Sequence, residues 1–212
     1  MNASRPDTNL TAIGLNCTLK RGKGASSTDK LLREVLAALA EHGATGNIYR
    51  VANLSILPGV SADEGEGDEW PGLRRKILAA DILVLGTPIW LGQPSSVAKR
   101  VLERMDAFLD EADERGRMPP YGKVAVAAVV GNEDGAHHCH AEMFQALNDV
   151  GFTIPPAGGT YWVGEAMGSV DYSDLESPNK KTQETTRMLA ANAVHLARLL
   201  KTAAYPGVES DD

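Results

Sequence analysis

A stretch near the middle of the chain combines residue types that could hold a flat ring. An apolar run at 82–86 opens into Thr87-Pro88-Ile89-Trp90-Leu91-Gly92. Proline restricts such a loop, glycine lets another group approach closely, and an aromatic side chain offers a flat apolar surface. Ligands of open parallel sheets bind beyond the carboxyl ends of buried strands. We therefore predict a ring-binding loop here, in which Trp90 either walls the pocket or packs on the ring.

A loop near the N-terminus combines hydroxyl and basic groups just before a helical pattern. Its candidate ligand residues are Thr18, Lys20, Ser26, Ser27 and Thr28. Free backbone N–H groups and the positive end of the helix dipole favour an anion at a helix N-terminus. The glycine fingerprints of dinucleotide sites and of P-loops are absent, which favours a single phosphate monoester. The alternative interpretation is a capped helix beside a solvated basic loop.

A third loop reads Gly131-Asn132-Glu133-Asp134-Gly135 and is rich in turn-forming residues. In a sheet of order 2-1-3-4-5 the strands that precede the three loops are adjacent, so the loops meet at one edge. A phosphate-binding loop beside two ring-contacting loops describes an FMN site. We expect backbone N–H groups of the second and third loops to stabilise the reduced, anionic ring.

Strand and helix patterns alternate along the chain. The predicted strands cover 10–16, 47–52, 82–86 and 124–130, with a fifth in two parts at 153–155 and 160–163. The predicted helices cover 28–41, 73–80, 95–109, 136–150 and 179–201, and the N-cap of the first is Ser27 or Thr28. The acidic stretch 59–72 is predicted to be an exposed loop. This order predicts an α/β flavodoxin-like, doubly wound, five-stranded parallel sheet of order 2-1-3-4-5 with helices on both faces. Residues 1–212 form a single predicted domain with flexible ends at 1–9 and 206–212.

The three loops give the chain a family resemblance over about residues 10–200. The chain resembles the NADPH-dependent FMN reductase family in three pieces. They are Thr18 and Lys20 with 26–28, Thr87-Pro88-Ile89-Trp90 followed by 97–104, and 131–135. The resemblance implies that the first loop holds the FMN phosphate and the other two hold the isoalloxazine ring and the ribityl chain. It also implies a homodimer or homotetramer, with the apolar stripe at 95–108 and Tyr161-Trp162 as candidates for the shared surface. The first loop departs from the family's short form, because residues 21–25 are inserted.

Composition narrows the classes of function. The net charge is −7 with no long basic run, which disfavours nucleic-acid binding. No apolar run approaches the ~20 residues that span a bilayer, and the N-terminal residues are polar. Two cysteines make no disulfide framework. We therefore expect a cytoplasmic protein with no membrane span.

A histidine-rich stretch, His137-His138-Cys139-His140, lies in a predicted helix. Only residues three or four apart share a helix face, and no second cluster completes a metal site. We expect no metal here and expect His138 near the edge of the flavin.

The predicted function is an FMN-dependent NAD(P)H oxidoreductase. Hydride would pass from the nicotinamide through the flavin to a quinone, a flavin or a similar small-molecule acceptor in a ping-pong scheme. The chemistry belongs to the cofactor, so we name no catalytic side chain. A flavodoxin-type electron carrier is the alternative, since acidity suits docking on basic partners. A binding module without flavin is a third, because fold does not determine function.

Overall fold

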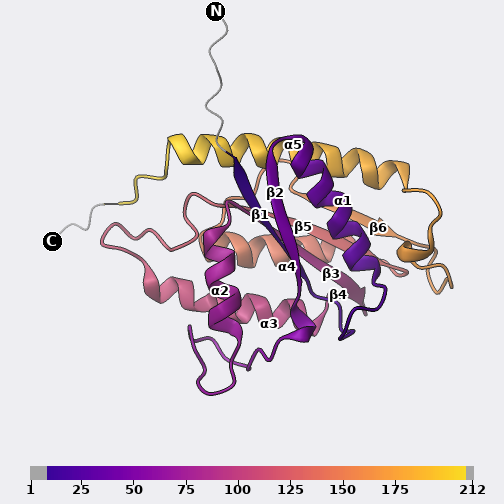
Figure 1. Ribbon diagram of the computed structural model, residues 1–212, viewed down its shortest axis with the longest axis horizontal. Helices are drawn as coiled ribbons and strands as arrows, with labels where there is room; N and C mark the ends of the chain where they lie inside the picture. The colour runs from indigo at the N-terminus through magenta and orange to yellow at the C-terminus, as the bar shows by residue number, and fades with distance from the viewer. Residues whose placement is uncertain (1–8, 209–212) are drawn as a thin grey trace, which may run out of the picture.

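The computed structural model describes residues 9–208 as a parallel sheet between two layers of helices (Figure 1). The strands are β1 (Leu10–Asn16), β2 (Ala44–Arg50), β3 (Ile82–Trp90), β4 (Gln93–Pro94), β5 (Val124–Gly131) and β6 (Gly159–Val163). The helices are α1 (Ser27–Glu41), α2 (Trp70–Ala79), α3 (Ser96–Met105), α4 (Ala136–Asp149) and α5 (Lys180–Thr202), with short 3₁₀ helices η1 (Val51–Asn53), η2 (Asp106–Glu111) and η3 (Tyr172–Asp174). The parallel strands have the order β2-β1-β3-β5-β6, and β4 pairs only with β3. The predicted flavodoxin-like class and the order of its five parallel strands are confirmed.

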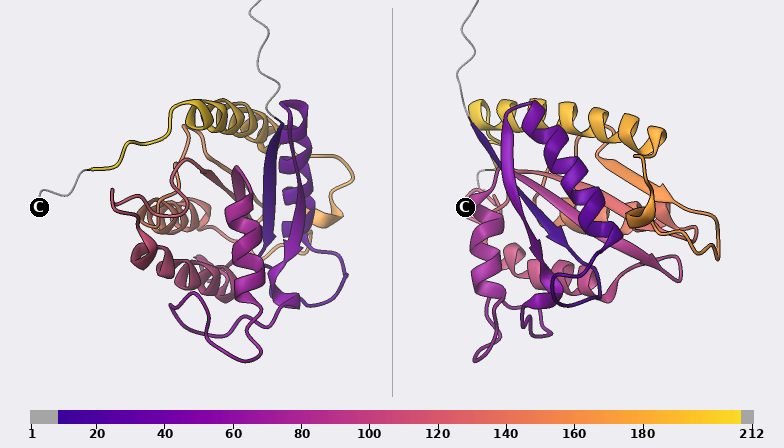
Figure 2. Two further views of the ribbon diagram at one scale, coloured as in Figure 1. Left: turned by 60° about the vertical axis from the view of Figure 1, so that its left-hand side comes forward. Right: turned by 45° about the vertical axis from the view of Figure 1, so that its right-hand side comes forward.

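Two apolar cores lie on the two faces of this sheet. One contains side chains of α1 and α5, and the other contains side chains of α2, α3 and α4. Figure 2 shows the same division, with α1 and α5 on one side of the strands. The central strand β5 is buried from Val124 to Val130, because it pairs with β3 and β6 and is covered on both faces.

Strand β3 extends beyond its predicted end at residue 86. Thr87 and Pro88 still pair with β5, and β3 then turns back on itself by pairing with β4. The two turn residues, Leu91 and Gly92, have φ of 53° and 74°. Positive φ at both central positions is typical of a two-residue type I′ hairpin turn. The predicted loop 87–92 is therefore mostly a strand and a tight turn, because β5 and β4 supply pairing partners.

Residues 59–69 form a mostly exposed loop, as predicted, but helix α2 starts earlier than predicted. Helix α2 begins at Trp70, inside the predicted loop, because Trp70 is buried and a proline follows at the start of the helix. The buried Arg104 guanidinium lies 2.7 Å from the Asp68 carboxylate and donates to the carbonyl oxygens of Leu57 and Ser61. Burial opposes ionisation of Asp68, but hydrogen bonds from Arg104 and from backbone N–H groups lower its pKa to about 2. The acidic segment is thus anchored to α3.

Several predicted boundaries are wrong by a few residues. β2 begins at Ala44 and gives way to η1 at residue 51, while α3 changes to η2 after Met105. Thr153 forms only an isolated bridge with Val124, so the fifth parallel strand is β6 alone. The N-cap of α1 is Ser26, whose hydroxyl accepts from the Asp29 N–H. These corrections reflect tertiary pairing, which local patterns do not contain.

The apolar stripe at 95–108 is not available as a shared surface. Val101, Met105 and Phe108 are fully buried in the chain's own core, and Trp162 is also buried. That part of the prediction is wrong, because the sheet itself covers the stripe. Of the predicted flexible ends, 1–8 and 209–212 lie outside the described residues, and Val208 donates to the Arg115 carbonyl. No helix within residues 9–208 has the length and apolarity to cross a membrane.

Candidate functional site

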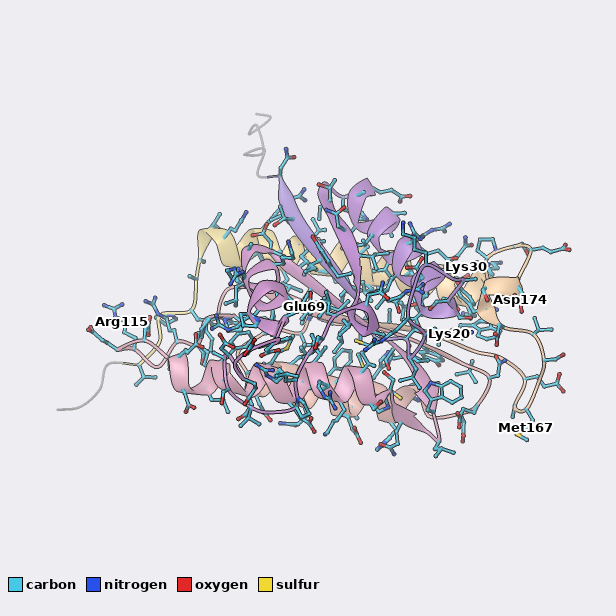
Figure 3. The ribbon with its side chains drawn as sticks, turned by 60° about the horizontal axis from the view of Figure 1, so that its bottom comes forward. Lys20, Lys30, Glu69, Arg115, Met167 and Asp174 are labelled. Atoms are coloured by element: carbon cyan, nitrogen blue, oxygen red, sulfur yellow. The ribbon has the colours of Figure 1, made fainter. Side chains whose placement is uncertain are left out.

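A cavity of about 460 Å³ lies where β1, β3, β5 and β6 end. Figure 3 shows Lys20 and Met167, which line it, at the end of the molecule opposite Arg115. The predicted cofactor-binding residues that line the cavity are Thr18, Lys20, Ser26, Ser27, Thr28, Pro88, Ile89, Trp90, Leu91, Gly131, Asn132 and Glu133. All three predicted loops therefore meet at one edge of the sheet, as the strand order requires.

One end of the cavity is formed by the first turn of α1. Ser26 caps the helix, and the N–H groups of Ser27 and Thr28 have no acceptor within the helix. The Ser27 hydroxyl accepts from the N–H of Ser173 at 3.2 Å and also contacts the Ser173 hydroxyl at 3.3 Å. Lys20 adds a positive charge at the rim. This end of the cavity is suited to an anion.

The opposite end is formed by the β3–β4 hairpin and the β5–α4 loop. The Glu133 carboxylate joins them, because its two oxygens accept from the N–H groups of Leu91 at 3.0 Å and of Gly92 at 3.2 Å. The Leu91 and Gly92 N–H groups therefore have an acceptor within the chain. This corrects the expectation that N–H groups of the second loop stabilise a reduced ring, because Glu133 already occupies these two.

Five predicted site residues do not line the cavity, namely Thr87, Gly92, Asp134, Gly135 and His138. Thr87 is buried and its hydroxyl accepts from the Ser95 N–H at 2.9 Å. Gly135 packs so closely on Gly92 that an added Cβ would lie 2.7 Å from the Gly92 Cα. His138 is on the surface of α4, with its Nε2 atom 3.0 Å from Glu142. Thr87, Gly92 and Gly135 thus pack beside the residues that line the cavity and hold the loops in place. His138 does not line the cavity.

Six lining residues lie outside the predicted set of cofactor-binding residues. They are Leu19, Val130, Trp162, Met167, Asp171 and Tyr172. The segment between β6 and α5 supplies Met167, Asp171 and Tyr172, and it is held by bonds from Asn132 Nδ2 to Asp171 and from the Met167 N–H to the Asn132 carbonyl. No local pattern in this polar segment signals a site, because its position depends on contacts with distant loops.

Tyr172 is the buried anchor of that segment. Its ring centroid lies 5.3 Å from that of Trp162 and 5.2 Å from Lys30 Nζ, and its hydroxyl donates to the Glu34 carboxylate. Burial and the Glu34 carboxylate raise the pKa of the Tyr172 phenol, so it stays protonated. Lys30 also donates to the carbonyl oxygens of Tyr172 and Leu175. The wall formed by Trp162 and Tyr172 is therefore fixed to α1.

Burial favours the neutral forms of both cysteine thiols and of His140. Cys17 is fully buried and burial raises the pKa of its thiol. Burial of His140 lowers its pKa to about 4, so its ring is neutral at pH 7. Within the described residues, no three His, Cys, Asp or Glu side chains are grouped as a metal site requires.

The donor set of the cavity fits a ligand with an anionic end and a flat apolar end. Hydroxyl and helix N–H groups lie at one end, Ile89 and Trp90 supply apolar surface at the other, and Trp162 adds apolar surface to the wall. The Oδ1 atom of Asn132 is buried and lacks a hydrogen-bond partner among the described residues. A ring N–H or a sugar-chain hydroxyl would satisfy it. FMN offers all of these groups.

Comparison with known proteins decides the family. The family model for NADPH-dependent FMN reductases matches residues 11–168. The chain belongs to this family. This family consists of flavin-dependent oxidoreductases whose cofactors are FMN and NAD(P)H.

Two curated relatives match most of the chain. A Mycobacterium bovis protein named divalent metal cation transporter MntH is 39% identical over 92% of this chain, which spans only 30% of that protein's length. The 8-demethyl-8-aminoriboflavin-5'-phosphate synthase of Streptomyces davaonensis is 34% identical, with 92% of this chain and 80% of the relative covered.

Solved structures share the fold of this chain. A crystal structure of RosB with the bound intermediate 8-demethyl-8-formylriboflavin-5'-phosphate superimposes with a TM-score of 0.82 at 34% identity, covering 92% of this chain and 82% of that chain. An archaeal flavodoxin, at 9% identity, has a TM-score of 0.55 over 91% of this chain and 99% of its own and shares the fold.

Proposed function

We propose that this FMN reductase family member passes reducing equivalents from NAD(P)H through bound FMN to a small-molecule acceptor such as a quinone or another flavin. The observation that carries the proposal is the form of the cavity. It has an anion-binding end at α1 and an apolar end whose lip is exposed, with Leu91 at 91% and Met167 at 98% exposure. An exposed lip leaves one face of a bound ring accessible to a nicotinamide and to an acceptor in turn.

The chain's own residues have separate proposed roles at this site. Thr18, Lys20 and the first turn of α1, with Ser26, Ser27 and Thr28, hold the phosphate. The hairpin residues 88–91 and Gly131 and Asn132 border the ring, and Glu133 holds the hairpin in place. FMN, when bound, supplies the hydride chemistry, and the protein supplies position and a partly dry environment.

Transient kinetics tests the proposal. The FMN-loaded protein is mixed anaerobically with NADPH or NADH, and flavin absorbance is followed before and after a quinone is added. We expect bleaching by the nicotinamide, recovery with the quinone, and parallel lines in double-reciprocal plots. Bleaching by dithionite but by neither nicotinamide would instead indicate the alternative, an electron carrier of the flavodoxin type.

A second candidate function is chemical modification of the flavin itself. It is supported by the 34% identity to the aminoriboflavin-phosphate synthase and by the bound 8-formyl flavin in RosB. In that case FMN would be a substrate as well as a ligand. Mass spectrometry of the flavin released after aerobic incubation distinguishes the two, because an oxidoreductase returns FMN with unchanged mass.

We also propose a cytoplasmic location. Cys17 and Cys139 are both free thiols in the structure, which agrees with a reducing compartment. Fractionation of cells with an antibody against the native chain tests this location.

A further inference from the structure

The cavity proposed to hold FMN is called the flavin cavity. A second cavity, of about 400 Å³, borders it. Leu19 lines both, so the β1–α1 loop separates them. The two residues after Leu19 divide between the cavities, with Lys20 at the flavin cavity and Arg21 at the second one. Segment 51–58 and the first turns of α3 form the other walls. The volume is in the range of small-ligand sites.

The inserted residues 21–25 are exposed but are fastened to the segment after β2, and Arg21 lines the second cavity. The Arg50 guanidinium donates to the carbonyl oxygens of Gly22 at 2.9 Å and Gly24 at 2.8 Å. The Gly22 N–H donates to Asn53 Oδ1 at 2.7 Å. In Figure 2 the loop after β1 and the segment after β2 lie at the same end of the sheet. The insertion is therefore fastened to η1, which brings Arg21 to the cavity.

The opposite wall is also fixed by the chain. Arg100 Nη1 donates to the Ile56 carbonyl at 3.1 Å and keeps its other N–H groups, since a guanidinium has five. Two carboxylates of the neighbouring segment are engaged, Asp68 by Arg104 and Glu69 by the Ser55 N–H at 2.7 Å. The ion pairs found within residues 9–208 do not include Arg21 or Arg100. Two cations thus line the cavity without a carboxylate partner among residues 9–208.

This combination fits a phosphate attached to a flat heteroaromatic group. Guanidinium groups bind phosphate through paired N–H donors and stack on aromatic faces. Leu54 and Val97 add apolar surface beside them. We propose that the second cavity binds the adenosine 2'-phosphate end of NADPH, and that Arg21 and Arg100 select NADPH over NADH. This inference rests on the proposed use of a nicotinamide at the adjoining flavin cavity.

Kinetics of the FMN-loaded protein tests the selection. Arg21→Ala should raise the KM for NADPH about tenfold more than the KM for NADH, because only NADPH has the 2'-phosphate and loses one charge-assisted contact to it. Lys23→Ala is the matched control, because Lys23 lies in the same insertion with the same charge but does not line the cavity. Equal changes for the two nicotinamides, or the same change in Lys23→Ala, would overturn the proposal.

Calorimetry provides a readout that needs no turnover. Adenosine 2',5'-bisphosphate should bind the FMN-loaded protein at least tenfold more tightly than adenosine 5'-monophosphate, and Arg21→Ala should abolish the difference. Arg21→Glu should abolish binding of the bisphosphate altogether. Selective binding without turnover of either nicotinamide would support the cavity assignment while refuting the proposed function. Turnover of both nicotinamides with no preference between the two probes would refute the assignment alone.

Discussion

The Ser27 hydroxyl has an observed contact and a proposed one. It contacts Ser173 in the segment after β6, and it lies in the helix turn suited to a phosphate. A phosphate arriving there would meet the N–H groups of Ser27 and Thr28 together with their hydroxyls. Replacing hydroxyls therefore tests both the phosphate assignment and the link to the distant segment.

We expect the double variant Ser27→Ala with Thr28→Ala to weaken the binding of FMN more than the binding of riboflavin, which lacks the phosphate. Each hydrogen bond contributes about 0.5–1.5 kcal/mol, and more when the acceptor is charged. Flavin fluorescence titration of both ligands measures the difference. Ser173→Ala is the control, because it removes the contact between the two hydroxyls without removing a hydroxyl from α1. Equal losses for FMN and riboflavin would show that the phosphate lies elsewhere.

The buried side chain of His140 makes the free energy of unfolding depend on pH. Burial lowers the folded-state pKa of His140 from 6.5 to about 4. Between these values the unfolded chain binds a proton that the folded chain does not, so stability falls as the pH decreases. The slope contributed by His140 is at most about 1.4 kcal/mol per pH unit.

We therefore expect His140→Phe to flatten the decline of the unfolding free energy between pH 6.5 and 4.5. Urea unfolding at a series of pH values measures the slope. His138→Gln, a change at an exposed position of the same helix, should leave the slope as in the unmodified chain. A slope that is unchanged in His140→Phe would contradict a neutral His140.

At the scale of elements, the β3–β4 hairpin depends on a side chain from another loop. Leu91 holds a positive φ of 53°, which side chains other than glycine rarely adopt, and Glu133 accepts from its N–H. The hairpin carries Trp90 and Leu91 into the lining of the flavin cavity. Its shape is therefore coupled to the β5–α4 loop.

Glu133→Ala is expected to lower the unfolding free energy by about 1–2 kcal/mol, because two N–H groups lose a charged acceptor. We also expect FMN affinity to fall, and Glu133→Gln, which keeps one acceptor oxygen, to have an intermediate effect. Thermal unfolding and flavin titration measure the two effects. Asp134→Ala, at the exposed neighbouring residue, should change neither. Unaltered FMN affinity in Glu133→Ala would show that the ring does not depend on the hairpin.

For the whole molecule, FMN binding should stabilise the fold through mass action. FMN at a hundredfold excess over its Kd should add about 2.7 kcal/mol. For a chain of this size that corresponds to a rise in Tm of about 5–10 °C. Differential scanning calorimetry with and without FMN measures the shift. A Tm that does not respond to FMN would contradict binding to the folded cavity.

Assembly is a second property of the whole molecule. The apolar lip of the cavity, defined by Trp90, Leu91 and Met167, is exposed, so a second subunit could cover it. We predict a homodimer or larger with FMN near the interface, and light scattering at micromolar concentration measures the mass. Met167→Glu should weaken the assembly, while Val60→Glu, at an exposed apolar residue of the anchored acidic segment, should not. A monomer with full reductase activity would refute the shared wall.

The class of the fold and the meeting of three loops could be predicted from the sequence. Buried strands such as 124–130 carry continuous apolar runs because both faces are covered, and helices carry apolar stripes, so their alternation is visible locally. Once the strand order is 2-1-3-4-5, the loops that begin at Thr18, Thr87 and Gly131 must meet at one edge. Most of the predicted lining residues followed from this topology.

Which groups of those loops face the cavity could not be predicted from the sequence, because it depends on tertiary contacts. Glu133 turned out to bind the hairpin N–H groups, the stripe at 95–108 is used in the core, and Tyr172 reached the cavity from a segment with no local pattern. Each of these outcomes depends on a contact between residues far apart in the chain. Local propensity and periodicity report the preferences of neighbouring residues, whereas such contacts exist only after the chain has packed.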